Sequence, residues 1–146
     1  MFLIMCRYEF KDWPAIKGDK EKFEYGQLPV LERDGKFYSQ SVAILKMLGT
    51  EHGFYPTDPE EAYHVDAVAE SLKDVYMGFF TMRYIPEEAK KDAFQKYVDE
   101  TLPNNFKVWE DNIKANSTQD YYHGDKLTLA DIGLLTFYTS IVSNGE

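Results

Sequence analysis

The strongest constraint on the fold of this chain is the helical spacing of its apolar residues after Pro59. Apolar side chains recur there three and four positions apart, which is the period of an amphipathic helix rather than of a strand. The first segment carries this pattern at Val65, Val68, Ala69, Leu72, Val75, Tyr76 and Phe79. Because no convincing strand follows, residues 59–146 are predicted to form an all-helical domain.

A second long helical segment is predicted after Pro86. Its apolar residues repeat at the same spacing and are Phe94, Tyr97, Val98, Leu102, Phe106, Trp109 and Ile113. Pro103 stands inside this segment, where it lacks the N–H donor and clashes with the preceding turn. The helix is therefore expected to kink or break at this proline.

The run Thr128-Leu129-Ala130-Asp131 predicts the start of one more helix, which extends to about residue 142. A capping Thr followed three positions later by an acidic residue fits the capping box, here with Asp in place of Glu. Leu127 and Ile132 are spaced as the hydrophobic staple that accompanies such a box.

Strands are predicted only in the first part of the chain. The apolar run Phe2–Tyr8 is interpreted as a strand, and the polar stretch Lys11–Glu24 as a loop with room for one helical turn. Two further strands, Pro29–Glu32 and Lys36–Ser39, are predicted to pair as a hairpin, because Asp34-Gly35 between them is a strong hairpin signal.

A helix is predicted directly after this hairpin, with Ser41 as its N-cap and Gly53 at its end. The segment Phe54–Pro59, with two prolines in six residues, is the best linker in the chain. The predicted fold class is therefore α/β plus all-α: an α/β domain over residues 1–53 and the helical domain over residues 59–146.

The composition excludes several classes of partner. A net charge of −9 argues against a surface for nucleic acid or anionic membranes, since both require basic patches. No apolar run approaches the length of a membrane span, and no cleavable signal is visible. A cytoplasmic protein is expected, with neither nucleic acid nor membrane as a partner.

Residues suited to redox or metal chemistry are few. Cys6 is the only cysteine, which excludes an internal disulfide and a C-x-x-C pair. His52, His64 and His123 are far apart in the sequence and show no ligand spacing. No metal site is expected.

The Leu28-Pro29 step allows two interpretations. If the bond is cis, the backbone of Leu28 turns away from its own sheet and offers an edge to which an extended peptide can bind. Alternatively, Pro29 simply begins an edge strand, where its missing donor is tolerated.

Gln40 and Ser41 precede the unpaired N–H groups of a helix start, which attract a carboxylate. Plain capping would explain the same residues. Trp13 and Lys17 lie in a loop that is placed to cover a ligand, with an indole N–H and a positive charge. By themselves Trp13 and Lys17 indicate little. The backbone edge at Leu28 and the nearby carboxylate seat at Gln40 and Ser41 together suggest a small, extended, acidic peptide as ligand.

The runs YEFKDWPAIK, YGQLPVLERDGKFYSQSVAILKML, HVDAVAESLKDVY and HGDKLTLADIGLL resemble, in order and spacing, the cytosolic glutathione S-transferases. The sigma-like class, which includes prostaglandin D synthases, is the most similar. The resemblance implies that residues 1–53 form an incomplete thioredoxin-like domain and that residues 59–146 form the incomplete helical domain.

The resemblance also implies a set of glutathione-binding residues. Trp13 and Lys17 match residues that contact the glycyl end, and Gly26, Gln27 and Leu28, with Pro29 as cis-proline, match the segment that pairs with the cysteinyl residue. Gln40 and Ser41 match the pair that holds the γ-glutamyl carboxylate. Asp74 matches an acidic residue that reaches the glutathione of the neighbouring subunit in a homodimer. The implied partners are glutathione, as a substrate, and a hydrophobic electrophile.

The family's first strand, with its catalytic Tyr, and the R-G-R-A-E-like helix have no counterpart here. The chain is expected to enter at the second strand and to stop before the last helices, so the catalytic Tyr would precede Met1. Tyr8 stands in the context of the second strand and is not assigned as catalytic.

Two functions are consistent with this pattern. The first is a fragment of a detoxifying glutathione transferase, and the second is a non-catalytic binding or structural protein of the same family. An unrelated two-part interaction domain is disfavoured by the ordered motifs.

Overall fold

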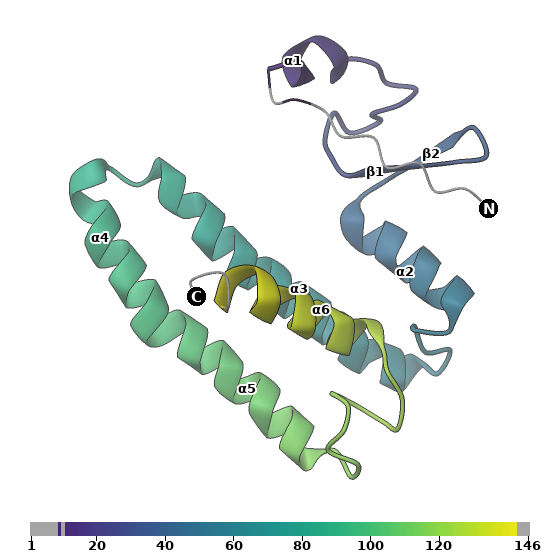
Figure 1. Cartoon of the computed structure of the whole chain (residues 1–146), viewed down its shortest axis with the longest axis vertical. Helices are drawn as coiled ribbons and strands as arrows, with labels where there is room; N and C mark the ends of the chain where they lie inside the picture. Colours follow the sequence, from purple (N-terminus) through teal and green to yellow (C-terminus); the bar gives the residue numbers. More distant parts are fainter. Residues whose placement is uncertain (1–8, 10, 143–146) are drawn as a thin grey trace. The chain divides into compact units, whose positions relative to one another are not determined.

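The computed structural model describes Glu9 and residues 11–142 (Figure 1). The strand predicted at Phe2–Tyr8, together with Cys6, lies outside the described residues. By its internal contacts the chain divides into two compact units, Met1–Glu51 and His52–Glu146. Among the described residues, strands occur only in the first unit, which confirms the predicted order of an α/β part followed by an all-helical part.

The first unit contains α1 (Trp13–Ile16), β1 (Val30–Arg33), β2 (Lys36–Ser39) and α2 (Ser41–His52). The strands pair antiparallel from Val30 opposite Ser39 to Arg33 opposite Lys36. Asp34 and Gly35 at the turn both have positive φ, 50° and 72°. This backbone matches the right-handed twist of a hairpin and explains why Asp-Gly predicted the turn correctly.

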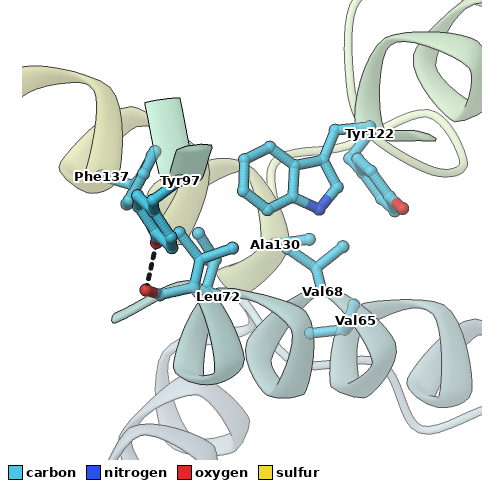
Figure 2. Packing of buried hydrophobic residues seen from close by; sticks show 9 residues of the cluster. Val65, Val68, Leu72, Tyr97, Tyr122, Ala130 and Phe137 are labelled. Atoms are coloured by element: carbon cyan, nitrogen blue, oxygen red, sulfur yellow. Dashed lines mark hydrogen bonds between the residues drawn. The ribbon is translucent and has the colours of Figure 1, made fainter. Parts of the chain in front are cut away.

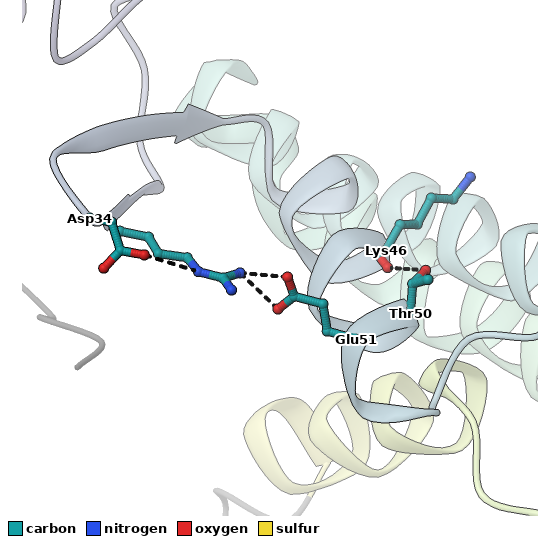
Figure 3. Close-up of polar contacts among 5 residues, drawn as sticks. Asp34, Lys46, Thr50 and Glu51 are labelled. Carbon is teal, nitrogen blue, oxygen red and sulfur yellow. Dashed lines mark hydrogen bonds and ion pairs between the residues drawn. The ribbon is translucent and has the colours of Figure 1, made fainter. Parts of the chain in front are cut away.

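An ion pair joins the hairpin to α2. Arg33 Nη1 donates to both carboxylate oxygens of Glu51 at 2.7 Å, while Arg33 Nε lies 4.0 Å from the carboxylate of Asp34 (Figure 3). The hydrogen bond to Glu51 raises the pKa of Arg33 above its ordinary value, against the lowering effect of burial. The pair fixes the side of the hairpin that faces α2.

The second unit begins with the long helix α3 (Pro59–Thr81), followed by the 3₁₀ turn η1 (Met82–Tyr84). The Asp58 carboxylate caps α3 by accepting from the backbone N–H groups of Glu60 and Glu61 at 2.9 and 3.0 Å. Pro59 occupies the first turn, where its missing N–H costs nothing.

The predicted second helix is continuous through its proline. It comprises α4 (Glu87–Lys96), the π-helical turn η2 (Tyr97–Thr101) and α5 (Leu102–Ala115). Pro103 cannot donate to the carbonyl of Asp99, and the wider turn before it, where the Leu102 N–H bonds to the Tyr97 carbonyl, accommodates the ring. Of the two expected effects of Pro103, the break is therefore wrong, while the regular α-helical hydrogen bonding does change to a π-helical turn just before the proline.

The core of the second unit forms where α5 and α6 (Leu129–Phe137) pack on α3 (Figure 2). Its buried side chains are Val65, Val68, Leu72, Val75, Tyr97, Trp109, Tyr122, Ala130 and Phe137. The rings of Trp109 and Phe137 meet edge to face at 5.7 Å, and Trp109 Nε1 donates to Ser71 Oγ at 2.9 Å. The Tyr97 hydroxyl donates to the Val75 carbonyl.

The apolar pattern of the sequence predicts more buried residues at the edges of this core than the structure contains. Phe79, Phe94, Val98 and Phe106 were predicted on buried faces, yet they are 37–46% exposed. Leu127, predicted to form a staple with Ile132, is 43% exposed. The helical period therefore predicts more buried side chains than the neighbouring helices cover.

The predicted capping box at α6 is confirmed. Asp131 Oδ2 accepts from the backbone N–H and the hydroxyl of Thr128 at 2.8 and 3.0 Å, and Ala130 N–H donates to Thr128 Oγ1 at 3.3 Å. The other oxygen of Asp131 accepts from the Tyr122 N–H at 2.6 Å.

After α6 the chain continues as the π-helical turn η3 (Tyr138–Val142). In the part of the chain that the structure describes, no helix is long and apolar enough to cross a membrane.

Asp131→Ala should lower the free energy of unfolding by about 2–3 kcal/mol, because it leaves the N–H groups of Tyr122 and Thr128 without an acceptor. Urea unfolding followed by circular dichroism measures the loss. Asp125→Ala, which removes an exposed carboxylate from the same loop, is the control and should change stability by less than about 0.5 kcal/mol. Equal effects of the two variants would contradict this role of Asp131.

Gly78→Ala should destabilise the second unit by about 1–3 kcal/mol despite the better helix propensity of alanine. A Cβ at this position would lie 2.7 Å from Cε2 of Tyr97, whose ring is buried. Gly133→Ala is the matched control, since its Cβ would meet only the flexible end of Leu72, at 2.9 Å. Thermal unfolding should show the larger loss for Gly78→Ala.

Candidate functional site

Trp13 and Lys17 lie on the single helical turn α1 and just after it. The Lys17 N–H donates to the Trp13 carbonyl at 3.0 Å and closes the turn. Lys17 is exposed, while Trp13 is half-buried, with its ring edge-on to Phe23 at 5.0 Å between centroids. The helical turn predicted within this loop is therefore present. The Trp13 ring packs against Phe23, and the Lys17 side chain lies in solvent.

Phe23 is the residue that anchors this loop, and sequence reasoning missed it. It is 2% exposed, and its N–H donates to the Asp19 carbonyl at 2.8 Å. Its own carbonyl accepts from the Gly26 N–H at 2.8 Å. Phe23 is the only apolar side chain between Ile16 and Tyr25, a signal by which it could have been found.

Gly26 brings the next candidate segment close to the α1 loop. Its φ of 61° lies in the left-handed region, which favours glycine. A Cβ there would lie 3.6 Å from the carbonyl oxygen of Lys17 and from Nζ of Lys20. Lys17 and Gly26, nine positions apart in the sequence, are thus neighbours in space.

Leu28 and Pro29 do not belong to the sheet. The bond between them is cis, and the β-ladder begins only at Val30. Gln27 and Leu28 are exposed, and within residues 11–142 the backbone N–H and C=O groups of Leu28 make no hydrogen bond. The interpretation of Pro29 as the first residue of a strand is therefore wrong.

Gln40, not Ser41, is the N-cap of α2. Its carbonyl accepts the first helical hydrogen bond, from the Ile44 N–H at 3.0 Å, and its φ is 72°. The N–H groups of Ser41, Val42 and Ala43 precede that bond and point out of the helix end. The first turn contains no acidic residue, so no side-chain carboxylate of the helix itself occupies this positive end.

The candidate residues form two groups within the first unit. Trp13 and Gly26 contact Phe23, and Lys17 lies beside Gly26. Gln40 and Ser41 stand at the end of β2. Lys22 lies over the ring of Phe37 at 5.3 Å from its centre, which links the first loop to β2.

Asp74 belongs to the second unit, on the exposed side of α3. Its neighbour Lys73 donates to Glu70 at 2.8 Å. That hydrogen bond, with the charges of Glu70 and Asp74, raises the pKa of Lys73.

Within the described residues, no cluster of three or more His, Cys, Asp or Glu side chains is placed to hold a metal ion.

Comparison with known proteins identifies relatives for both units. A family model described as the C-terminal domain of glutathione S-transferase matches residues 73–145. Glutathione S-transferase A of Cavia porcellus is 34% identical over 134 residues, covering 92% of this chain and 59% of the relative. Glutathione S-transferase P 10 of Caenorhabditis elegans is 32% identical, covering 88% and 57%. The chain thus spans less than two thirds of these relatives.

Two solved structures are similar to this structure over nearly the whole chain. Prostaglandin synthase D of Nilaparvata lugens superposes with a TM-score of 0.79 at 32% identity, covering 96% of this chain and 70% of the other. A glutathione S-transferase of Necator americanus, described as monomeric, gives 0.79 at 27% identity, with 97% and 69% coverage. Because the family model matches half of the chain and the two sequence relatives are 34% and 32% identical to it, the chain belongs to the glutathione S-transferase family.

Proposed function

We propose that this protein is a glutathione transferase, which adds the thiolate of glutathione to a hydrophobic electrophile. The observation that carries the proposal is the exposed backbone of Leu28, which makes no hydrogen bond within residues 11–142, in the same unit as the start of α2, whose first turn contains no acidic residue. An extended peptide can add its backbone to such an edge. Among the described residues none is assigned to thiolate activation, so the predictions below concern binding.

In this proposal each group of candidate residues binds a different part of glutathione. The N–H groups at the start of α2, with the Ser41 hydroxyl and the Gln40 amide, hold the γ-glutamyl carboxylate. Gln27 and Leu28 pair with the cysteinyl residue and so place its thiol. Trp13 and Lys17 hold the glycyl carboxylate, and Asp74 reaches the glutathione of a partner subunit.

The reaction requires the thiolate, because the thiol itself is a poor nucleophile. The sulfur donates its electron pair to the electrophilic carbon, a new S–C bond forms, and a leaving group takes the electrons of the bond that breaks. The residues above hold the peptide so that its sulfur is oriented, which reduces the entropy cost of the encounter.

The sigma-like class, a homodimer, a detoxifying role and a cytoplasmic location are parts of the same proposal. The similarity to prostaglandin synthase D of Nilaparvata lugens supports the class, although relatives named for other classes also match. The homodimer would use α3, which carries Asp74. The relative from Necator americanus is described as monomeric, so sedimentation of this chain is the direct test.

Ser41→Ala should weaken glutathione binding about tenfold, because it removes one donor to a carboxylate. Isothermal titration calorimetry measures the affinity, and Thr50→Ala at the other end of α2 is the control. The loss should shrink to about twofold for a glutathione analogue whose γ-glutamyl carboxylate is amidated, since a neutral amide oxygen accepts a weaker hydrogen bond from Ser41 than a charged carboxylate does. Equal losses for both ligands would contradict the assignment.

Lys17→Gln should weaken binding about three- to fivefold, and the loss should shrink at high salt. The effect should disappear for the glycyl methyl ester of glutathione but persist for the γ-glutamyl amide. Lys36→Gln, an exposed lysine at the hairpin turn, is the control of equal charge. A response to the wrong carboxylate would show that the peptide binds in the reverse direction.

Phe23→Leu should weaken glutathione binding without removing any group that touches the ligand, because the Trp13 ring loses the aromatic ring against which it packs. Fluorine NMR of protein labelled with 5-fluorotryptophan separates the two tryptophans. The Trp13 signal should shift or broaden, whereas that of Trp109 should not. Phe54→Leu, in the second unit, is the matched control, and an unmoved Trp13 signal would show that Phe23 does not position the loop.

A further inference from the structure

Two histidines from distant parts of the sequence stack on each other in the second unit. His64 lies on α3, and His123 lies in the loop that precedes α6. Their ring centroids are 4.0 Å apart, and the ring planes differ by 19°. This separation is shorter than the roughly 4.5–7 Å that is usual for aromatic pairs. The stack is therefore a close, direct contact between α3 and this loop.

The stacked rings lie at the edge of the core. Both histidines are half-buried. The ring of Tyr63 meets that of His64 edge to face at 5.4 Å between centroids. His123 also borders a pocket of about 230 Å³, which the segment before α3 closes on its other side. Partial burial leaves the rings accessible to protons but shields them less well than water would, so charges on them interact more strongly than charges at the surface.

The loop around His123 is fixed on both sides of the histidine. The preceding residue, Tyr122, has a buried ring, and its N–H donates to Asp131 at 2.6 Å. The following residue, Gly124, has a φ of 71°, and its carbonyl accepts from Asn116 Nδ2 at 2.8 Å. A displacement of the His123 ring therefore disturbs the loop next to the hydrogen bond that Asp131 accepts.

Imidazole is the side chain that ordinarily changes charge closest to neutral pH. Two neutral rings can stay stacked, and so can one neutral ring and one protonated ring. Two protonated rings would place like charges only 4.0 Å apart, where their repulsion is strong. His64 and His123 therefore bind protons as a coupled pair, in which the stacked arrangement opposes the second proton.

The charged side chains that line the pocket with His123 are of both signs: Glu61 from α3, and Asp125 and Lys126 from the loop. Two carboxylates and one ammonium leave a charge of −1, which balances one protonated ring but not a second. Glu60, four positions before His64, is exposed and lies outside the pocket, where water and salt screen its charge. The segment 53–57 contributes no charged side chain, and its Tyr55 hydroxyl donates to Asp66 at 3.1 Å.

We propose that His64 and His123 form a pH-sensitive latch between α3 and the loop before α6. At neutral pH the stacked rings hold the loop on α3. When both rings are protonated, between about pH 6.5 and pH 5, they separate and the loop opens at Tyr122. The open chain then binds one proton more than the closed chain, so the closed state loses stability as the pH falls. The latch is independent of glutathione and of the proposed transferase activity.

Nuclear magnetic resonance of the histidine Cε1–H signals, titrated from about pH 8 to pH 5 with the full chain, tests the coupling directly. The signals of His64 and His123 should each follow two proton-binding steps. His52, at the exposed end of α2, should follow one and is the internal control. In His64→Phe, which keeps an uncharged ring at this position, the His123 signal should follow a single step.

Hydrogen exchange of the Tyr122 N–H measures the opening of the loop. After correction for intrinsic exchange, its opening constant should rise about tenfold in the unmodified chain between about pH 6.5 and pH 5.5, because opening takes up one proton. The rise should be less than about twofold in His64→Phe and should remain about tenfold in His52→Gln, the matched control.

Substitutions of the charges in the pocket should move the transition in opposite directions. Glu61→Gln removes a charge that offsets the second proton, so opening should begin at a higher pH. Lys126→Gln removes a charge that opposes it, so the second proton should bind the closed chain more readily and opening should begin at a lower pH. Each shift should be about 0.3–0.5 pH units.

Three results would overturn the inference. These are a single-step titration of both histidines in the unmodified chain, an equal rise of Tyr122 exchange in His64→Phe, and a transition that disappears when a metal chelator is added. The last would mean that a bound metal ion, rather than the charge of the rings, controls the loop. If His64→Phe does not fold, the titration of the unmodified chain still decides between coupled and independent histidines.

Discussion

The helical unit depends on the carboxylate of Asp131. Its two oxygens accept three hydrogen bonds, from the Thr128 N–H and hydroxyl and from the Tyr122 N–H. They therefore fix both the first residue of α6 and the loop that precedes it. The Leu129 N–H donates to the Phe54 carbonyl at 2.9 Å, so the same helix start also holds the segment before α3. With its start fixed, α6 places Ala130 and Phe137 against α3.

The first unit is organised differently. Its described part contains a two-stranded hairpin, the helix α2 and a loop with the helical turn α1, anchored by Phe23, with the Arg33–Glu51 pair between hairpin and α2. In this described part few side chains are buried, and the backbone N–H and C=O groups of Leu28 make no hydrogen bond. Unpaired backbone is costly when it is buried but available to a ligand when it is exposed. The unpaired groups of Leu28 and of the α2 start are exposed, which suits the binding of an extended peptide.

The sequence and the structure disagree where a neighbouring element decides the outcome. Phe79 continues the apolar period of α3 but is exposed, because that period predicts more buried side chains than the neighbouring helices cover. Pro103 cannot donate a backbone hydrogen bond, yet the helix continues because the wider turn η2 precedes it, in which the Leu102 N–H bonds to the Tyr97 carbonyl. Ser41 has the better capping side chain, but the backbone at Gln40 adopts the left-handed conformation after β2, and the helix begins one residue earlier than a serine cap allows.

Local chemistry alone determined the hairpin turn, the capping box and the periods of the long helices, because each depends on residues within a few positions of one another. Asp34 and Gly35 tolerate the left-handed backbone of the turn. Thr128 and Asp131 form hydrogen bonds with each other at the first turn of α6, and the apolar repeat within α3 is sufficient to predict that helix. Only the tertiary structure showed that Phe23 contacts both Trp13 and Gly26 and that Lys17 lies beside Gly26. Those contacts join positions on different elements, and no spacing rule connects residues whose separation is set by the path of the chain between them.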